Sequence, residues 1–218
     1  MKIGFFGDSF CSTVDSGDAS YQTYIKKILN EYKAELVHVG RSGSSIGDVL
    51  MNQLPSTTHN LDICIFVWTD SPRLFNREVR NINAASADHN EGEIWSAAKS
   101  YYKYLYDYEF TTIQYKALLE YIDNHILINF LNSAKIIHLW SFGENDGTYA
   151  YRWKHGVEIR PSLIHASVGS RDFLKMSNVQ GPNHISGEEN NNLVFNWIKK
   201  AIDNYSNGLL LNEKVGAE

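Results

Sequence analysis

Four short runs of apolar and β-branched residues constrain the fold of this chain more than any other feature. They cover residues 2–6, 36–39, 62–68 and 135–142, and each is bounded by turn-forming or polar residues. Between the first two runs, residues 20–32 place apolar side chains at intervals of three and four, which is the period of an amphipathic helix. Strands that alternate with helices predict a parallel sheet with right-handed crossovers.

The expected fold is therefore α/β, as three α/β/α layers of flavodoxin-like type around a central parallel sheet of about five strands. Ser20 is the expected N-cap of the first helix. After the third strand, a polar loop and two helical patterns form an expected helical insertion at about 76–132. Residues 40–48 read as a loop, and a helix closes the chain. No stretch has the composition of a linker, so residues 1–218 are expected to form one domain.

Charge and composition argue against several classes of partner. The net charge is -5, with 20 Lys and Arg against 25 Asp and Glu, so there is no basic field to attract nucleic acid. No window approaches the roughly 18 apolar residues of a membrane-spanning helix, and the first residues lack the pattern of a signal peptide. We expect a soluble, cytoplasmic protein that does not bind membranes. Its oligomeric state stays open.

Metals and cofactors are also not expected. The eight histidines show no ligand spacing such as HExxH, and there is neither a P-loop nor a GxGxxG fingerprint. The two cysteines, Cys11 and Cys64, cannot form a disulfide framework and are expected to be reduced thiols.

A candidate nucleophile follows the first predicted strand, in the sequence GDSF at residues 7–10. Ligands of a parallel sheet bind beyond the carboxyl ends of the strands. A serine at that place can attack a substrate while its backbone N–H faces the developing charge. Ser9 is this residue, although a serine that only caps a turn explains the same pattern.

Three sequence blocks carry a resemblance to a known family. GDSF at 7–10, GRSGSS at 40–45 and PNHIS at 182–186 are similar to the first, second and fifth blocks of SGNH (GDSL-type) hydrolases, in the same order. The resemblance implies the SGNH hydrolase fold and ester hydrolysis. It also implies that Ser9 is the nucleophile, that the Gly43 backbone N–H binds the oxyanion, and that His184 is the general base.

Two positions depart from the family pattern. Thr69 stands where the family has an oxyanion-binding Asn, so the resemblance makes its hydroxyl an oxyanion donor beside the N–H groups of Ser9 and Gly43, although a hydroxyl is shorter than an amide. Gly181 stands where the family has the Asp that orients the histidine. Asn145, in the sequence GEND after the fourth strand, is a candidate substitute donor, and Asp172 is a candidate displaced acid.

The remaining polar candidates flank these positions. Asp8 precedes Ser9, Asp70 follows Thr69, and Asn183 precedes His184. Arg73, just past the third strand, would either clamp an anionic substrate or form a surface salt bridge.

The leading expectation is a serine esterase or O-deacetylase that uses a Ser-His dyad or an atypical triad on a small-molecule or glycan ester. The alternative is a catalytically degenerate SGNH-fold protein with a binding or structural role. A nucleotide binder that cradles phosphate in its Ser/Gly loops is a third and weaker interpretation.

Overall fold

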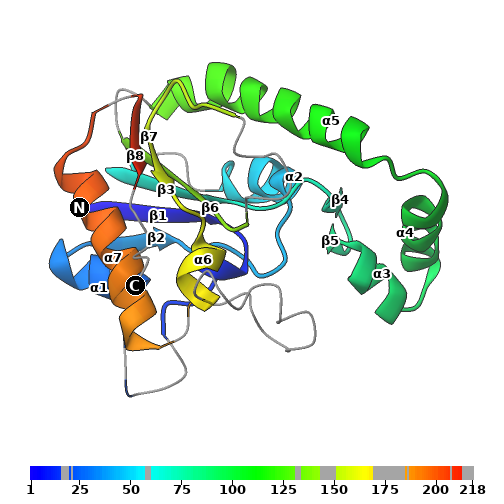
Figure 1. Ribbon diagram of the computed structural model, residues 1–218, viewed down its shortest axis with the longest axis horizontal. Coiled ribbons are helices and arrows are strands. Elements are labelled where there is room, and N and C mark those ends of the chain that lie inside the picture. The colour runs from blue at the N-terminus through cyan, green and yellow to red at the C-terminus, as the bar shows by residue number, and fades with distance from the viewer. Residues whose placement is uncertain are drawn as a thin grey trace.

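Six parallel strands form the central sheet of the computed structural model, which describes residues 1–15, 20, 22–56, 60–130, 134–142, 151–168, 185, 187–206 and 208–212. The strand order is β2-β1-β3-β6-β7-β8 (Figure 1). These are β1 (Lys2–Gly7), β2 (Glu35–His38), β3 (Ile63–Trp68), β6 (Lys135–Trp140), β7 (Val157–Arg160) and β8 (Leu209–Asn212). With β1 between β2 and β3, the order follows the flavodoxin-like pattern. The predicted α/β class with a central parallel sheet is confirmed.

Helices cover both faces of this sheet (Figure 1). One face carries α1 (Tyr24–Glu31), α6 (Leu163–Val168) and α7 (Glu188–Asp203). The other face carries α2 (Ile46–Asp48), the π-helical turn η2 (Val49–Gln53), α5 (Tyr108–Tyr121), and the short turns η3 (Ile122–Ile126) and η4 (Leu127–Phe130). The sheet therefore forms the middle of three layers.

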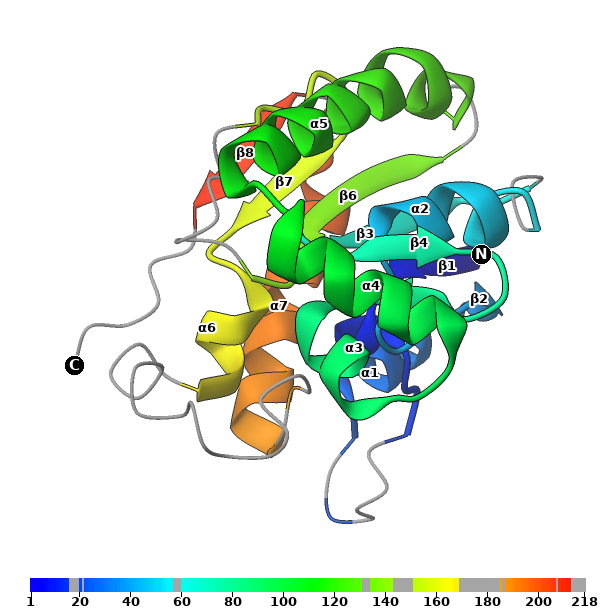
Figure 2. The same ribbon diagram turned by 90° about the vertical axis from the view of Figure 1, so that its right-hand side faces the viewer.

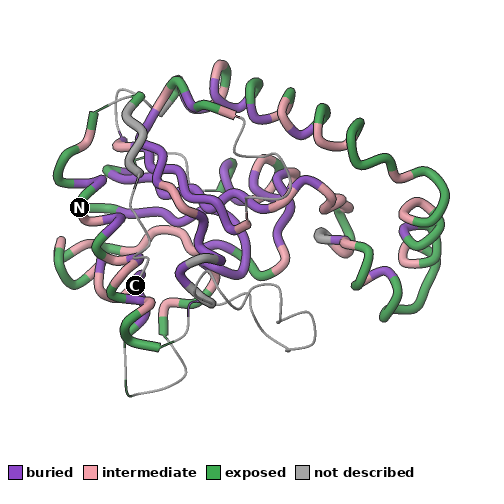
Figure 3. The backbone as a smooth tube through the Cα atoms, in the orientation of Figure 1, coloured by how far each residue is buried: buried purple, intermediate pink, exposed green. Residues whose placement is uncertain are grey.

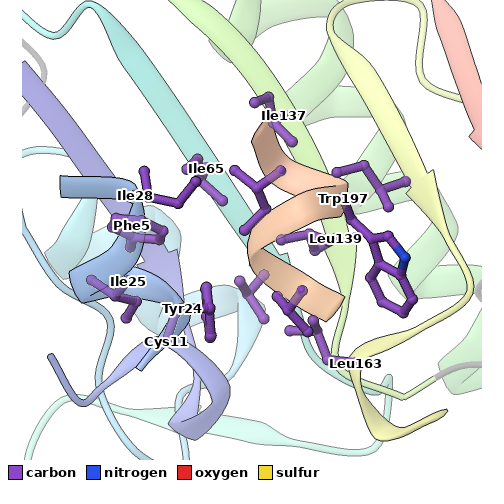
Figure 4. Close-up of a cluster of buried hydrophobic side chains, with 14 of the residues drawn as sticks. Phe5, Cys11, Tyr24, Ile25, Ile28, Ile65, Ile137, Leu139, Leu163 and Trp197 are labelled. Atoms are coloured by element: carbon purple, nitrogen blue, oxygen red, sulfur yellow. The ribbon is translucent and has the colours of Figure 1, made fainter. Parts of the chain in front are cut away.

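Alternating side chains of the strands divide the core into two apolar clusters. On β3, Ile63, Ile65 and Val67 pack toward α1, α6 and α7, while Cys64, Phe66 and Trp68 pack toward α5 and η2. Figure 4 shows the first cluster, in which Ile28 of α1 lies near Phe5 and Ile65. The tube in Figure 3 is buried along the strands and exposed mainly on the outer sides of the helices. Strands that are buried on both faces explain the continuous apolar runs of the sequence.

The insertion after β3 is not purely helical. The polar loop expected at 76–92 contains the strand β5 (Arg80–Ile82), which pairs antiparallel with β4 (Leu74–Asn76), and also the helix α3 (Ala84–His89). The helix α4 (Glu93–Tyr104) follows. A small third cluster, including Ile82, Ala87 and Ala98, holds this part together. Figure 2 shows α3 and α4 in front of the sheet, in a view toward the carboxyl ends of the strands.

Several expected boundaries are wrong. Thr23 rather than Ser20 caps α1, because its side chain accepts a hydrogen bond from the Lys26 N–H at 3.3 Å. The loop expected at 40–48 already contains α2. The strands β7 and β8 were not expected: each has only four residues, and β7 lies in a stretch without a clear apolar run. None of the helices in the described ranges is both long and apolar enough to cross a membrane.

Candidate active site

The turn that carries Ser9 begins where β1 ends. Gly7 has φ +146°, and a Cβ atom there would lie 2.2 Å from the Val67 carbonyl oxygen, so only glycine fits. Asp8 then caps the single helical turn η1 (Ser9–Cys11) by accepting a hydrogen bond from the Phe10 N–H at 3.1 Å. Ser9 is only 4% exposed. The predicted nucleophile therefore lies at the carboxyl end of β1, on a turn fixed by its neighbours.

The loop after β2 is hydrogen-bonded to this turn. The Gly40 N–H donates to the Cys11 carbonyl at 2.9 Å, and the Arg41 N–H donates to the Gly7 carbonyl at 3.0 Å. Gly43 lies two residues further on with φ +77°, and the next N–H, of Ser44, donates back to the Arg41 carbonyl at 3.1 Å. The loops that carry Ser9 and Gly43 are thus joined through their backbones.

A network of buried side chains around Gln53 also connects these two loops. The Gln53 amide accepts from the Gly7 N–H at 2.9 Å and donates to the Gly7 carbonyl at 3.0 Å. It also donates to the Ser44 hydroxyl at 2.8 Å and to Asp48 at 3.1 Å. Asp48 accepts further bonds from the Ser44 hydroxyl at 2.7 Å and the Asn52 amide at 2.6 Å.

The pKa of Asp48 reflects this network. Burial alone would raise it, but hydrogen bonds from Asn52, Ser44 and Gln53, together with the charge of Arg41, hold the pKa below its ordinary value. Asp48 is therefore an ionised, fully hydrogen-bonded carboxylate inside the protein.

At the exit of β3, the Thr69 hydroxyl is already engaged. It donates to the Asp70 carboxylate at 3.1 Å, and the Thr69 carbonyl accepts a hydrogen bond from the Tyr115 hydroxyl of α5. Asp70 in turn accepts from Arg73 Nε at 2.8 Å. Thr69, Asp70 and Arg73 thus form one chain of contacts at this edge of the sheet.

The Arg73 side chain is only 7% exposed, so it does not form the surface salt bridge that the sequence also allowed. Its Nη1 atom lies 3.4 Å from the Ser44 carbonyl oxygen and 3.8 Å from Asp8 Oδ2. The guanidinium also lies over the Phe142 ring, 5.6 Å from its centroid, just past β6. One side chain therefore contacts residues beyond the ends of β1, β2, β3 and β6.

Asp8 is the least satisfied group of this cluster. Burial raises its pKa, because the lowering effects of the Arg73 charge and of the Phe10 N–H are smaller. Within the described ranges, Asp8 Oδ2 and the Ser141 hydroxyl are both buried without a hydrogen-bond partner.

Five residues of the predicted site lie outside the described part of the chain: Asn145, Asp172, Gly181, Asn183 and His184.

The residue after His184 is described, and this residue, Ile185, is buried. Its carbonyl accepts from the Asn191 amide at 3.1 Å, and Asn191 Oδ1 accepts from the Tyr24 N–H at 2.7 Å. The Tyr24 hydroxyl donates to the Phe10 carbonyl at 2.7 Å. Three hydrogen bonds thus connect the neighbour of His184 to the neighbour of Ser9.

Sequence reasoning missed Asp48, Gln53 and Asn191. Asp48 and Gln53 are five residues apart, which matches the hydrogen-bond spacing of a π-helix and not the 3.6-residue period used to find helices. Asn191 lies in a polar run at the start of α7, where its complete burial has no signal in the sequence.

The chain matches no family model, no curated protein and no solved structure. Among the residues that the structure describes, no group of three or more His, Cys, Asp or Glu side chains could hold a metal ion.

Proposed function

We propose that the protein is a serine-dependent ester hydrolase of esterase or O-deacetylase type. Ser9 would attack the ester carbonyl, and His184 would take the Ser9 proton and pass it to the leaving alkoxide. The backbone N–H groups of Ser9 and Gly43 would bind the oxyanion. Water activated by His184 would then release the acyl group from Ser9. The substrate would be an O-acyl or O-acetyl ester of a small molecule or glycan.

The observation that carries this proposal is the attachment of the Ser9 turn to the loop that holds Gly43. The two loops are held together by backbone hydrogen bonds from Gly40 and Arg41. The Gln53 amide, which pairs with Gly7, adds to this connection. An oxyanion site made of two backbone N–H groups needs this kind of fixed geometry.

The neighbouring thiol does not compete as a nucleophile. Burial, followed by the charge of Asp8, raises the pKa of Cys11 well above its ordinary value, so the thiol stays protonated near neutral pH. Ser9 is therefore the residue of this turn that we assign to the reaction.

A kinetic comparison tests the proposal. We expect the wild type to hydrolyse a short-chain p-nitrophenyl ester, and Ser9→Ala and His184→Ala to lose that activity. Ser96→Ala, which alters an exposed serine on α4, is the matched control and should keep it. Serine enzymes with incomplete triads retain about 10³- to 10⁴-fold acceleration over water, which is within reach of a chromogenic assay. Equal hydrolysis by wild type and Ser9→Ala would contradict the proposal.

A catalytically degenerate binding protein is the second candidate. The hydrogen bond from Thr69 to Asp70 favours it, because this hydroxyl proton is then not available to an oxyanion. Its distinguishing result is the absence of turnover in the same assay.

A further inference from the structure

Thr69 cannot serve as a side-chain oxyanion donor in the observed geometry. A hydroxyl group has one proton, and that of Thr69 is donated to Asp70 Oδ1 at 3.1 Å. Turning the hydroxyl toward a substrate would leave the Asp70 carboxylate without that bond. If the site is hydrolytic, a different side chain must supply the third donor, or the oxyanion has only backbone donors.

Arg73 contacts the residues that adjoin both proposed backbone donors. Its Nη1 atom is 3.4 Å from the carbonyl of Ser44, the residue after Gly43, and 3.8 Å from Asp8, the residue before Ser9. The guanidinium is thus next to both loops that carry the proposed backbone donors. Among the described residues, Arg73 is the only cationic side chain that contacts both Asp8, in the Ser9 turn, and Ser44, in the Gly43 loop.

The orientation of the guanidinium is fixed on three sides. Asp70 accepts from Nε at 2.8 Å, Ser44 and Asp8 lie on the Nη1 side, and Cζ lies over the Phe142 ring. The other terminal nitrogen, Nη2, has no hydrogen-bond partner among the residues that the structure describes. An arginine has five N–H donors, so this group can bind a ligand while the existing contacts remain.

We propose that Arg73 Nη2, and not the Thr69 hydroxyl, donates the side-chain hydrogen bond to the oxyanion formed during ester hydrolysis. This inference rests on the proposed function. When Ser9 Oγ bonds to the carbonyl carbon, the carbonyl electron pair moves onto the oxygen and the serine proton moves to His184. Arg73 stays protonated throughout, and its charge-assisted bond is strongest when the oxygen is negative.

Asp70 is then a positioning residue. Its carboxylate holds Nε and so determines the direction of Nη2. Thr69 acts on Asp70 through its hydroxyl and does not contact the substrate. In this interpretation Thr69 replaces the oxyanion-binding Asn of SGNH hydrolases, and Arg73 supplies the hydrogen bond that the Asn would donate.

The test compares kcat and KM for ester hydrolysis among variants of the full chain. We expect Arg73→Gln to lower kcat by about 10²- to 10³-fold, the usual effect of losing one oxyanion donor, with little change in KM. Arg77→Gln, at an exposed arginine of the β4-β5 turn, should keep the wild-type rate. Thr69→Val should lower kcat by less than Arg73→Gln does.

Two further measurements separate a donor from a structural arginine. Arg73→Lys keeps the charge and tests the case in which Arg73→Gln does not fold. We expect it to stay folded and to lose kcat, because an ammonium cannot contact Asp70 and the oxyanion in the same way. Ethylguanidinium, but not ethylammonium, should restore part of the activity of Arg73→Ala. A purely structural role would give no such rescue.

The outcomes distinguish the inference from the function on which it rests. If Ser9→Ala is as active as the wild type, the proposed function fails and the inference fails with it. If Ser9→Ala is inactive but folded Arg73→Gln or Arg73→Lys retains the wild-type kcat, the hydrolase stands and the role of Arg73 is wrong. A larger loss of kcat in Thr69→Val than in Arg73→Gln would also overturn it.

Discussion

Two completely buried aspartates lie at the same edge of the sheet, and their surroundings differ. Asp48 accepts hydrogen bonds from Ser44, Asn52 and Gln53, and its pKa is below the ordinary value. Asp8 accepts one, from the Phe10 N–H, and its pKa is above the ordinary value because burial dominates. Burial raises the pKa of both carboxyl groups, and only around Asp48 do the hydrogen-bond donors outweigh it.

The difference indicates different roles. A fully hydrogen-bonded carboxylate is a structural element, and through Gln53 the Asp48 network fixes the Gly7 peptide. A buried carboxyl oxygen that accepts no hydrogen bond from the described residues, next to the candidate nucleophile, is the kind of local cost that proteins retain at functional sites. Substitutions at the two positions should therefore affect different properties.

The largest effect is expected for Asp48→Ala. The change leaves the donors of Ser44, Asn52 and Gln53 without their acceptor, and we expect it to lower the free energy of unfolding by about 3 kcal/mol. Urea-induced unfolding measures it. Asp88→Ala is the control, because Asp88 forms only an exposed ion pair with Lys99 and should change stability by about 0.5 kcal/mol or less. Equal losses in the two variants would remove the distinction between the aspartates.

Gln53→Leu should have the next largest effect. The substitution removes the amide that pairs with both the N–H and the carbonyl of Gly7, and we expect a loss of about 2 kcal/mol in urea unfolding. Because Gly7 precedes the Ser9 turn, kcat for ester hydrolysis should fall as well. Gln114→Leu, at an exposed position of α5, is the matched control. Unchanged kcat in a folded Gln53→Leu would show that the network does not position the site.

Acid titration of stability should separate the two aspartates by sign. The lowered pKa of Asp48 gives stability that is fully present above its ordinary value of 3.8 and is lost as pH falls toward the lowered value. The raised pKa of Asp8 has the opposite sign, because the folded state takes up a proton more readily and gains stability as pH falls toward 3.8.

Unfolding free energies of wild type, Asp48→Asn and Asp8→Asn across acidic pH measure these contributions. The advantage of wild type over Asp48→Asn should shrink on acidification below about pH 4. Wild type should instead gain relative to Asp8→Asn as pH falls toward 3.8. Parallel curves for all three proteins would refute the comparison.

The smallest change in stability is expected for Asp8→Asn at neutral pH. The amide oxygen can still accept from the Phe10 N–H, and the buried charge is removed, so stability should change by about 1 kcal/mol or less. Thermal and urea unfolding of Asp8→Asn and Asp48→Asn measure the change in stability of each variant. A loss as large as that of Asp48→Asn would mean that the Asp8 carboxylate, through Arg73, is structural after all.

The sequence was sufficient for the strands β1, β2, β3 and β6 and for the position of Ser9. Residues such as Phe5, Ile65 and Leu139 are buried in long apolar runs, and a turn after β1 had to lie at the carboxyl edge of a parallel sheet. The strand β7 was missed because its four residues lie in an irregular-looking stretch.

The polar contacts of the candidate site depend on distances that no sequence spacing gives. Arg73 and Ser44 are separated by 29 positions, and their contact exists only because the ends of β2 and β3 meet at one edge. The bond between Thr69 and Asp70 depends on a rotamer, and the pairing of Asp48 with Gln53 depends on a π-helical turn. The sequence therefore predicted which loops meet at this edge of the sheet. It did not predict which hydrogen-bond donors of these loops are available to a ligand.

Labelling with a fluorophosphonate tests the central claim most directly, because phosphonylation requires an activated serine and a site that stabilises the anionic oxygen. Intact-protein mass spectrometry followed by peptide mapping should find a single adduct on Ser9. The adduct should be absent in Ser9→Ala, absent in heat-denatured protein and present in Ser96→Ala. A wild type that stays unlabelled, or that is labelled equally with and without Ser9, would contradict the assignment of this turn as a hydrolase active site.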